Sequence, residues 1–120
     1  MSQIQELIDR YASSWNETDA ARRRRLIEQV WTPDGHYLDP LMSADGIDGI
    51  DAMIVGIQQH LPGLVMRRVG DIDAHHDRVR FTWELAAPDG QPVAGGLDIG
   101  TLADGRLRSI VGFIDFAPGV

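Results

Sequence analysis

The sequence predicts an α+β fold in which three helices come first and an antiparallel sheet follows. Apolar residues recur every three or four positions as far as Leu61, which is typical of amphipathic helices. From Arg78 to Leu85, apolar and polar residues alternate instead, which is typical of a half-buried strand, and turn signals then mark off two further strands. Because no repeat, linker or change in composition divides the 120 residues, we expect a single domain over residues 1–120.

Three segments carry the helical pattern. The apolar face of the first helix is made up of Ile4, Leu7, Ile8, Tyr11 and Trp15. Thr18 and Asp19 then offer capping side chains for a second helix. Its apolar residues are Leu26, Ile27, Val30 and Trp31, and Pro33-Asp34-Gly35 is expected to end it. A third helix fits Ile50, Met53, Ile54, Ile57 and Leu61, with Pro62-Gly63 as its end.

Strands are predicted on both sides of the third helix. "HYLDP" indicates a short strand that ends at Pro40. "RVRFTWEL" places Val79, Phe81, Trp83 and Leu85 on one face and charged or polar residues on the other. The turn signals "PDGQ" and "ADGR" separate this strand from two more, around Pro92–Ala103 and Arg106–Phe116.

Composition and charge exclude several classes of function. The chain has no cysteine, so disulfides and thiolate chemistry are excluded, and its net charge of −7 argues against a nucleic-acid partner. No run of about 18 apolar residues could cross a membrane, and the polar N-terminal segment does not resemble a secretion signal. We therefore expect a cytoplasmic protein with neither nucleic acid nor membrane as partner.

The histidines and serines do not form a recognisable catalytic or metal-binding pattern. His75 and His76 are adjacent, and adjacent strand residues point to opposite faces of a sheet. The serines lack the sharp turn motif that exposes a nucleophile. We predict no metal site and no cofactor.

Asp98 stands out because it lies within the otherwise apolar or small segment "VAGGLDIGTL". In an extended strand it shares a face with Gly96 and Gly100, whose small size is expected to leave open volume around it. Burial in such a hollow would raise the pKa of the carboxyl, because desolvation disfavours the charged form. The alternative is a carboxylate satisfied by backbone N–H groups at a bulge or by an arginine. Spacing leaves both possibilities open.

Three stretches together resemble a known superfamily. They are "DRYASSWNETD", with Tyr11 five residues before an asparagine, "WTPDGHYLDP", ending in Asp39-Pro40, and "GGLDIGTLADGRL", with Asp98 before a turn. Their order and spacing resemble the nuclear transport factor 2-like superfamily, and within it the SnoaL-like polyketide cyclases and the ketosteroid isomerases. The resemblance implies a cone-shaped, cystatin-like roll: three N-terminal helices packed on a strongly curved antiparallel sheet that encloses a pocket.

The resemblance also implies roles for individual residues. Asp39 matches the general base of the isomerases, and Tyr11 and Asp98 match the two donors to the oxyanion, with Asp98 held protonated by an apolar site. Asp115 in "GFIDF" is a rival base. The residues expected to line the pocket or bind in it are Trp15, Trp31, Tyr37, Phe81, Trp83, Leu85 and Asp115.

Two functions remain open at this point. The first is a cofactor-independent enzyme that moves a proton next to the carbonyl of a hydrophobic small molecule, as an isomerase or an aldol-type cyclase. The second is a non-catalytic ligand-binding or dimerisation module of the same fold, because fold does not determine function. In either case we expect a homodimer formed across the sheet, because Leu97 and Ile99 lie opposite the pocket face and are too apolar to be left in water.

Overall fold

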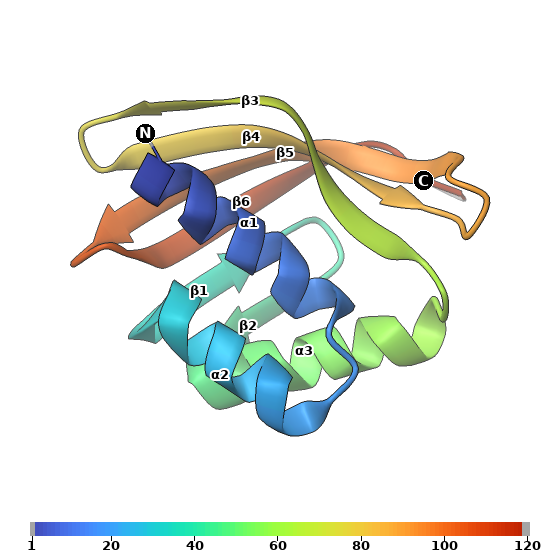
Figure 1. Ribbon diagram of the computed structural model, residues 1–120, viewed down its shortest axis with the longest axis horizontal. Helices are drawn as coiled ribbons and strands as arrows, with labels where there is room; N and C mark the ends of the chain where they lie inside the picture. Colours follow the sequence, from blue (N-terminus) through green and yellow to red (C-terminus); the bar gives the residue numbers. More distant parts are fainter. Residues whose placement is uncertain (1, 119–120) are drawn as a thin grey trace.

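A computed structural model describes residues 2–118. Its helices are α1 (Ser2–Asn16), α2 (Ala20–Val30) and α3 (Gly46–His60). Its strands are β1 (Trp31–Leu38), β2 (Ser43–Asp45), β3 (Val65–His75), β4 (Arg78–Ala86), β5 (Pro92–Ala103) and β6 (Arg106–Phe116). The three helices lie on one side of a single curved sheet, and the long strands β3 to β6 arch over α1 (Figure 1). The α+β fold with three N-terminal helices is confirmed.

The sheet is mixed, which corrects the prediction of an antiparallel sheet. Its strand order is β2-β1-β6-β5-β4-β3, so the sheet is open and ends at β2 and β3. All neighbours pair antiparallel except β1 and β6, which run parallel. Parallel neighbours need a long connection between them, and here the chain from β2 to β5, including α3, supplies it.

The first strand begins earlier than predicted. Helix α2 ends at Val30, and β1 runs from Trp31 through Pro33-Asp34-Gly35, which the sequence marked as a helix stop before a later strand. Trp31 pairs with Leu107 but His36 pairs with Ser109, so the residues between form a bulge in β1. Proline, which has no N–H to donate to a ladder, is tolerated at such a bulge.

The predicted inward faces are confirmed. In β4, Val79 and Phe81 are buried while Arg78 and Arg80 are exposed. Ile8 and Tyr11 of α1 are buried in the same core as Ile27 of α2 and Ile54 of α3. Asp19 caps α2 as predicted, because its side chain accepts a hydrogen bond from the backbone N–H of Arg22 at 2.9 Å. The core therefore fills the space between the helices and the concave side of the sheet.

The glycines of β5 do not leave open volume, which corrects another expectation. A Cβ atom on Gly100 would lie 3.0–3.2 Å from side-chain atoms of Val79, Ile110 and Leu107. A Cβ atom on Gly96 would lie 1.8 Å from the carbonyl oxygen of Phe113. Both glycines thus allow neighbouring groups to pack closely against β5, and the cavity beside Asp98 is bounded by other residues.

Candidate active site

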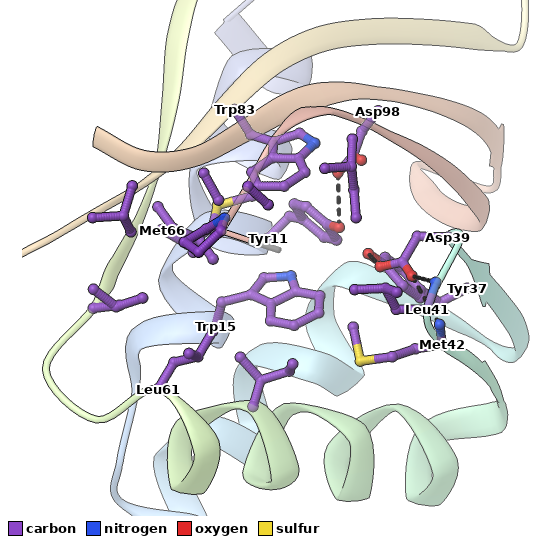
Figure 2. A pocket seen from close by; sticks show the side chains of 18 residues that line it. Tyr11, Trp15, Tyr37, Asp39, Leu41, Met42, Leu61, Met66, Trp83 and Asp98 are labelled. Carbon is purple, nitrogen blue, oxygen red and sulfur yellow. Dashed lines mark hydrogen bonds between the residues drawn. The ribbon is translucent and has the colours of Figure 1, made fainter. Parts of the chain in front are cut away.

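A cavity of about 310 Å³ lies between α1, α3 and the concave side of the sheet (Figure 2). Most of its lining is aliphatic or Met side chains from α3, the strands and the connecting loops. The exceptions are two tyrosines, two tryptophans and two aspartates, and these are Tyr11, Tyr37, Trp15, Trp83, Asp39 and Asp98. An apolar cavity with a few convergent polar groups is typical of a small-molecule site.

Asp98 and Tyr11 meet at one point of this cavity. The Tyr11 hydroxyl donates a hydrogen bond to Oδ2 of Asp98 at 3.0 Å, and Asp98 is only 2% exposed. Among the described residues, neither an arginine nor a backbone N–H bonds to this carboxyl, and its Oδ1 atom has no partner. The two alternatives for Asp98, a bulge and an arginine, are therefore not what the structure contains.

Burial is the main reason why the pKa of Asp98 is raised from 3.8 to about 7. The nearby charge of Asp39 raises this pKa further, whereas the Tyr11 hydroxyl and the indole N–H of Trp83 lower it by favouring the ionised form. Burial also raises the pKa of Tyr11 well above its ordinary value, so its hydroxyl remains a donor. At neutral pH the Asp98 carboxyl is thus protonated in a large fraction of molecules and can donate from Oδ1.

Asp39 forms a second tyrosine–aspartate pair on another side of the cavity. The Tyr37 hydroxyl donates to Oδ2 of Asp39 at 2.7 Å. Its Oδ1 atom accepts the backbone N–H groups of Leu41 and Met42, both at 2.8 Å, in the turn between β1 and β2. Burial raises the pKa of Tyr37, so this phenol also stays protonated. These bonds hold the Asp39 carboxyl at the cavity wall (Figure 2).

Gly112 allows the two acids to approach each other, and sequence reasoning missed it. It pairs with Asp98 across β5 and β6. A Cβ atom there would lie 2.8 Å from Oδ1 of Asp98, 3.3 Å from Cβ of Asp39 and 3.5 Å from the Tyr37 hydroxyl. A lone glycine inside an apolar strand often marks a close approach by another group, and "IVGFI" carried that signal.

Two amide side chains fix the end of α1 and with it Trp15. Asn16 exchanges two hydrogen bonds with the backbone of Met66 in β3, each 2.8 Å long. Gln58 of α3 donates to the carbonyl oxygens of Trp15 and Glu17 at 3.0 and 2.9 Å. The Trp15 ring consequently lies between the two tyrosines, with centroids 6.3 Å from Tyr11 and 5.6 Å from Tyr37.

The structure brings most of the predicted site residues to the cavity, but not all of them. Trp15, Tyr37, Trp83 and Leu85 line it together with the three predicted catalytic residues. Trp31 and Phe81 do not line it, because both are buried in the core, where their rings pack against Tyr11 at centroid distances of 6.1 and 5.7 Å. They support the Tyr11 ring from the core side.

Asp115 lies outside the cavity, which corrects its prediction as a binding residue and rival base. Gly96 pairs with Ile114 and Gly95 with Phe116, so Asp115 is the extra residue of a β-bulge. Its side chain is exposed, whereas Ile114 lines the cavity. The bulge thus makes this carboxylate point toward the solvent instead of the cavity.

The part of the chain that the structure describes also bears on metal binding and on membranes. It contains no group of three or more His, Cys, Asp or Glu side chains placed to hold a metal ion. None of its helices is long and apolar enough to cross a membrane.

We expect Asp98 to make the folded protein less stable as the pH rises from about 4 to about 7. Its pKa is raised from 3.8 to about 7 by folding, so the folded protein holds a proton that the unfolded chain releases. The resulting stabilisation is fully present below pH 3.8 and is lost as the pH passes about 7. Urea unfolding gives the free energy of unfolding of the wild type and of Asp98→Asn, whose side chain at position 98 cannot ionise. The difference between the two free energies at each pH measures the contribution of the Asp98 proton. A difference that stays constant between about pH 4 and pH 8 contradicts the raised pKa.

Known proteins resemble this chain over nearly its whole length. Residues 8–110 match the family described as "SnoaL-like domain". A candidate isomerase of the SnoaL-like family from Agrobacterium tumefaciens is 42% identical, with a TM-score of 0.90 over 96% of this chain and 99% of that one. No curated protein matches the sequence significantly.

Two more distant structures share the fold. One is a candidate SnoaL-like polyketide cyclase from Jannaschia, 21% identical, with a TM-score of 0.75 over 95% of this chain and 86% of that one. The other is an NTF2-like protein of unknown function from Mesorhizobium loti, 13% identical, with a TM-score of 0.69 over 95% of this chain and 92% of that one.

Proposed function

The chain belongs to the SnoaL-like group of the nuclear transport factor 2-like superfamily, and on that premise we propose that it moves a proton beside a carbonyl group. The substrate is a hydrophobic small molecule held in the cavity, and the reaction is an isomerisation or an aldol-type cyclisation. One observation carries this proposal: the Tyr11 hydroxyl and the buried Asp98 carboxyl meet in an apolar cavity that also contains Asp39. The polyketide cyclase and isomerase names of the related structures support it.

The roles follow from what enolate chemistry requires. A base must take a proton from the carbon, and donors must stabilise the negative charge that develops on the oxygen. We assign the base to Asp39 and the donors to Tyr11 and protonated Asp98. The free Oδ1 atom of Asp98 supports its assignment, because a proton there has no acceptor among the described residues and is available to a ligand oxygen.

Proton exchange into a bound ketone tests the proposal. The protein should accelerate incorporation of deuterium from D₂O into the methyl group of 2-acetonaphthone, an uncharged ketone, as followed by NMR. Tyr11→Phe removes one oxyanion donor and should lower the accelerated rate by about 10²–10³-fold. A ketone that binds in the cavity without any acceleration of exchange would support the non-catalytic binding module instead.

An exposed apolar face on the outer side of the sheet supports a homodimer. Leu97 pairs with Phe113, and Ile99 pairs with Val111, so the four side chains form one patch over β5 and β6. Phe113 is 50% exposed, Ile99 38% and Val111 37%. Apolar groups gathered in this way mark an interaction surface more often than scattered ones do.

We expect the protein to have twice the 13.3 kDa mass of the chain in solution. Phe113→Lys should convert it to the monomer, because it places a charge in the middle of the patch, and light scattering at micromolar concentration measures both masses. Val65→Lys makes the same kind of change at an exposed apolar site on the edge strand β3, away from the patch, so it is the matched control and should stay dimeric. A monomer mass for the wild type contradicts the dimer.

A further inference from the structure

Two tryptophans of the cavity carry N–H groups that have no partner. The indole nitrogens of Trp15 and Trp83 are buried and make no hydrogen bond within residues 2–118. A buried donor without an acceptor is costly, so such groups are rare and call for an explanation. The Nε1 atom of Trp31 also lacks a partner among the described residues, but that ring lies in the core and does not line the cavity.

The two N–H groups flank the point where Tyr11 and Asp98 meet. In Figure 2 the nitrogen of Trp83 lies on the side of its ring nearer to Asp98, and the nitrogen of Trp15 on the side nearer to Tyr11. Each indole N–H lies near a polar neighbour and lowers its pKa, Asp98 for Trp83 and Tyr11 for Trp15, but neither contact has the geometry of a formed hydrogen bond. Gly96 makes room for this arrangement, because a Cβ atom there would lie 3.0 Å from the Trp83 ring.

The charges around the cavity narrow the class of ligand. None of the described residues that line the cavity is basic, whereas two of them, Asp39 and Asp98, carry a carboxyl group. An anionic ligand would therefore be repelled without any compensating cation. The donors that remain are a carboxylic acid, tyrosine hydroxyls and indole N–H groups, and all of them can bind the oxygens of an uncharged molecule.

We propose that Trp15 and Trp83 are specificity-determining residues whose N–H groups donate to a second oxygen of the ligand. The first oxygen is the carbonyl that Tyr11 and Asp98 bind, and to that extent the inference rests on the proposed function. The cavity then selects uncharged ligands that carry two acceptor oxygens at one end of a hydrophobic body.

A matched pair of ligands isolates the second oxygen. We would measure by calorimetry the binding of 2-acetonaphthone and of 1-hydroxy-2-acetonaphthone to the wild type, Trp15→Phe and Trp83→Phe. Each variant keeps an aromatic ring but removes one N–H. Each should reduce the preference for the hydroxyketone by about three- to tenfold, which corresponds to one neutral hydrogen bond. Effects of the smaller ring on packing cancel in the ratio of the two affinities.

Indole NMR signals supply a readout that does not depend on mutation. The protein contains three tryptophans, so a ¹⁵N-labelled sample shows three indole N–H signals. Replacing 2-acetonaphthone by the hydroxyketone should move the Trp15 and Trp83 signals downfield and leave the Trp31 signal in place, since only the first two line the cavity.

Three outcomes would overturn the inference. The first is an equal loss of affinity for both ligands in each variant, because the indoles would then act only as walls. The second is the absence of any difference in the Trp15 and Trp83 signals between the two ligands. The third is tighter binding of 1-hydroxy-2-naphthoate, the anionic analogue, than of the hydroxyketone. Deuterium exchange separates this inference from the proposed function: exchange without the two-oxygen preference overturns the inference alone, and the preference without exchange overturns the catalytic proposal alone.

Discussion

Replacing Asp39 by asparagine is expected to slow deuterium exchange into a bound ketone by about 10²–10⁴-fold, the contribution of a positioned general base. Asparagine has nearly the same shape, and its amide oxygen can still accept the backbone N–H groups of Leu41 and Met42 that Asp39 now accepts. The turn between β1 and β2 should therefore keep its structure, and the loss should lie in kcat. The rate and the melting temperature would be measured on the same sample.

Asp115→Asn is the matched control for this experiment. It makes the same chemical change on an acid that lies at an exposed bulge of β6, outside the cavity. We expect it to leave the exchange rate within about twofold of the wild type, in line with the small effects typical of surface substitutions. An Asp39→Asn protein that exchanges at the wild-type rate would remove Asp39 from the role of base.

Gly96→Ala is expected to cost more than about 3 kcal/mol of unfolding free energy, above the usual range for overpacking. The new Cβ atom would lie 1.8 Å from the carbonyl oxygen and 2.8 Å from the carbonyl carbon of Phe113. These are backbone atoms of β6, so relief of the clash requires the two strands to separate beside Trp83. Urea denaturation measures the loss.

Gly56→Ala makes the same change where nothing opposes it. A Cβ atom on this residue of α3 meets no atom within 4 Å outside its own helix. Alanine is better than glycine within a helix by roughly 0.5–1 kcal/mol, so we expect this variant to be slightly more stable than the wild type. Equal stability changes for the two variants would contradict the packing described for β5 and β6.

The helices and β4 could be predicted from their apolar periods, and β5 and β6 from the turn signals that bound them. The same alternation placed Asp98 on the inward face of β5, where it is found. Strand β3 was missed, since Gly70, with a φ of +74°, interrupts its pattern and its pairing with β4 shifts in register nearby. The parallel pairing of β1 and β6 could not be predicted, because the two strands lie far apart in the sequence. Only the packing of α3 and the rest of the sheet brings them side by side.

Only part of the candidate site could be predicted from the sequence. Period-two alternation shows which face of a strand is inward, but it does not show whether the space there is cavity or core. Phe81 and Trp83 share one face of β4, yet only Trp83 lines the cavity. Likewise, the sequence places Tyr11 and Trp31 on apolar helix faces, and only the fold shows that Trp31 begins a strand and packs behind the Tyr11 ring.

The central claim is that burial beside Tyr11 keeps the Asp98 carboxyl protonated in a large fraction of molecules near neutral pH, so that it can donate a hydrogen bond in the cavity. The most direct measurement is a pH titration of the Asp98 carboxyl carbon by NMR on ¹³C-labelled protein, with its signal assigned from the Asp98→Asn variant. We expect a midpoint at about pH 7, because desolvation raises the pKa from 3.8 to about 7. A midpoint close to 3.8, the ordinary value, would show an ionised carboxylate at neutral pH and would contradict the account.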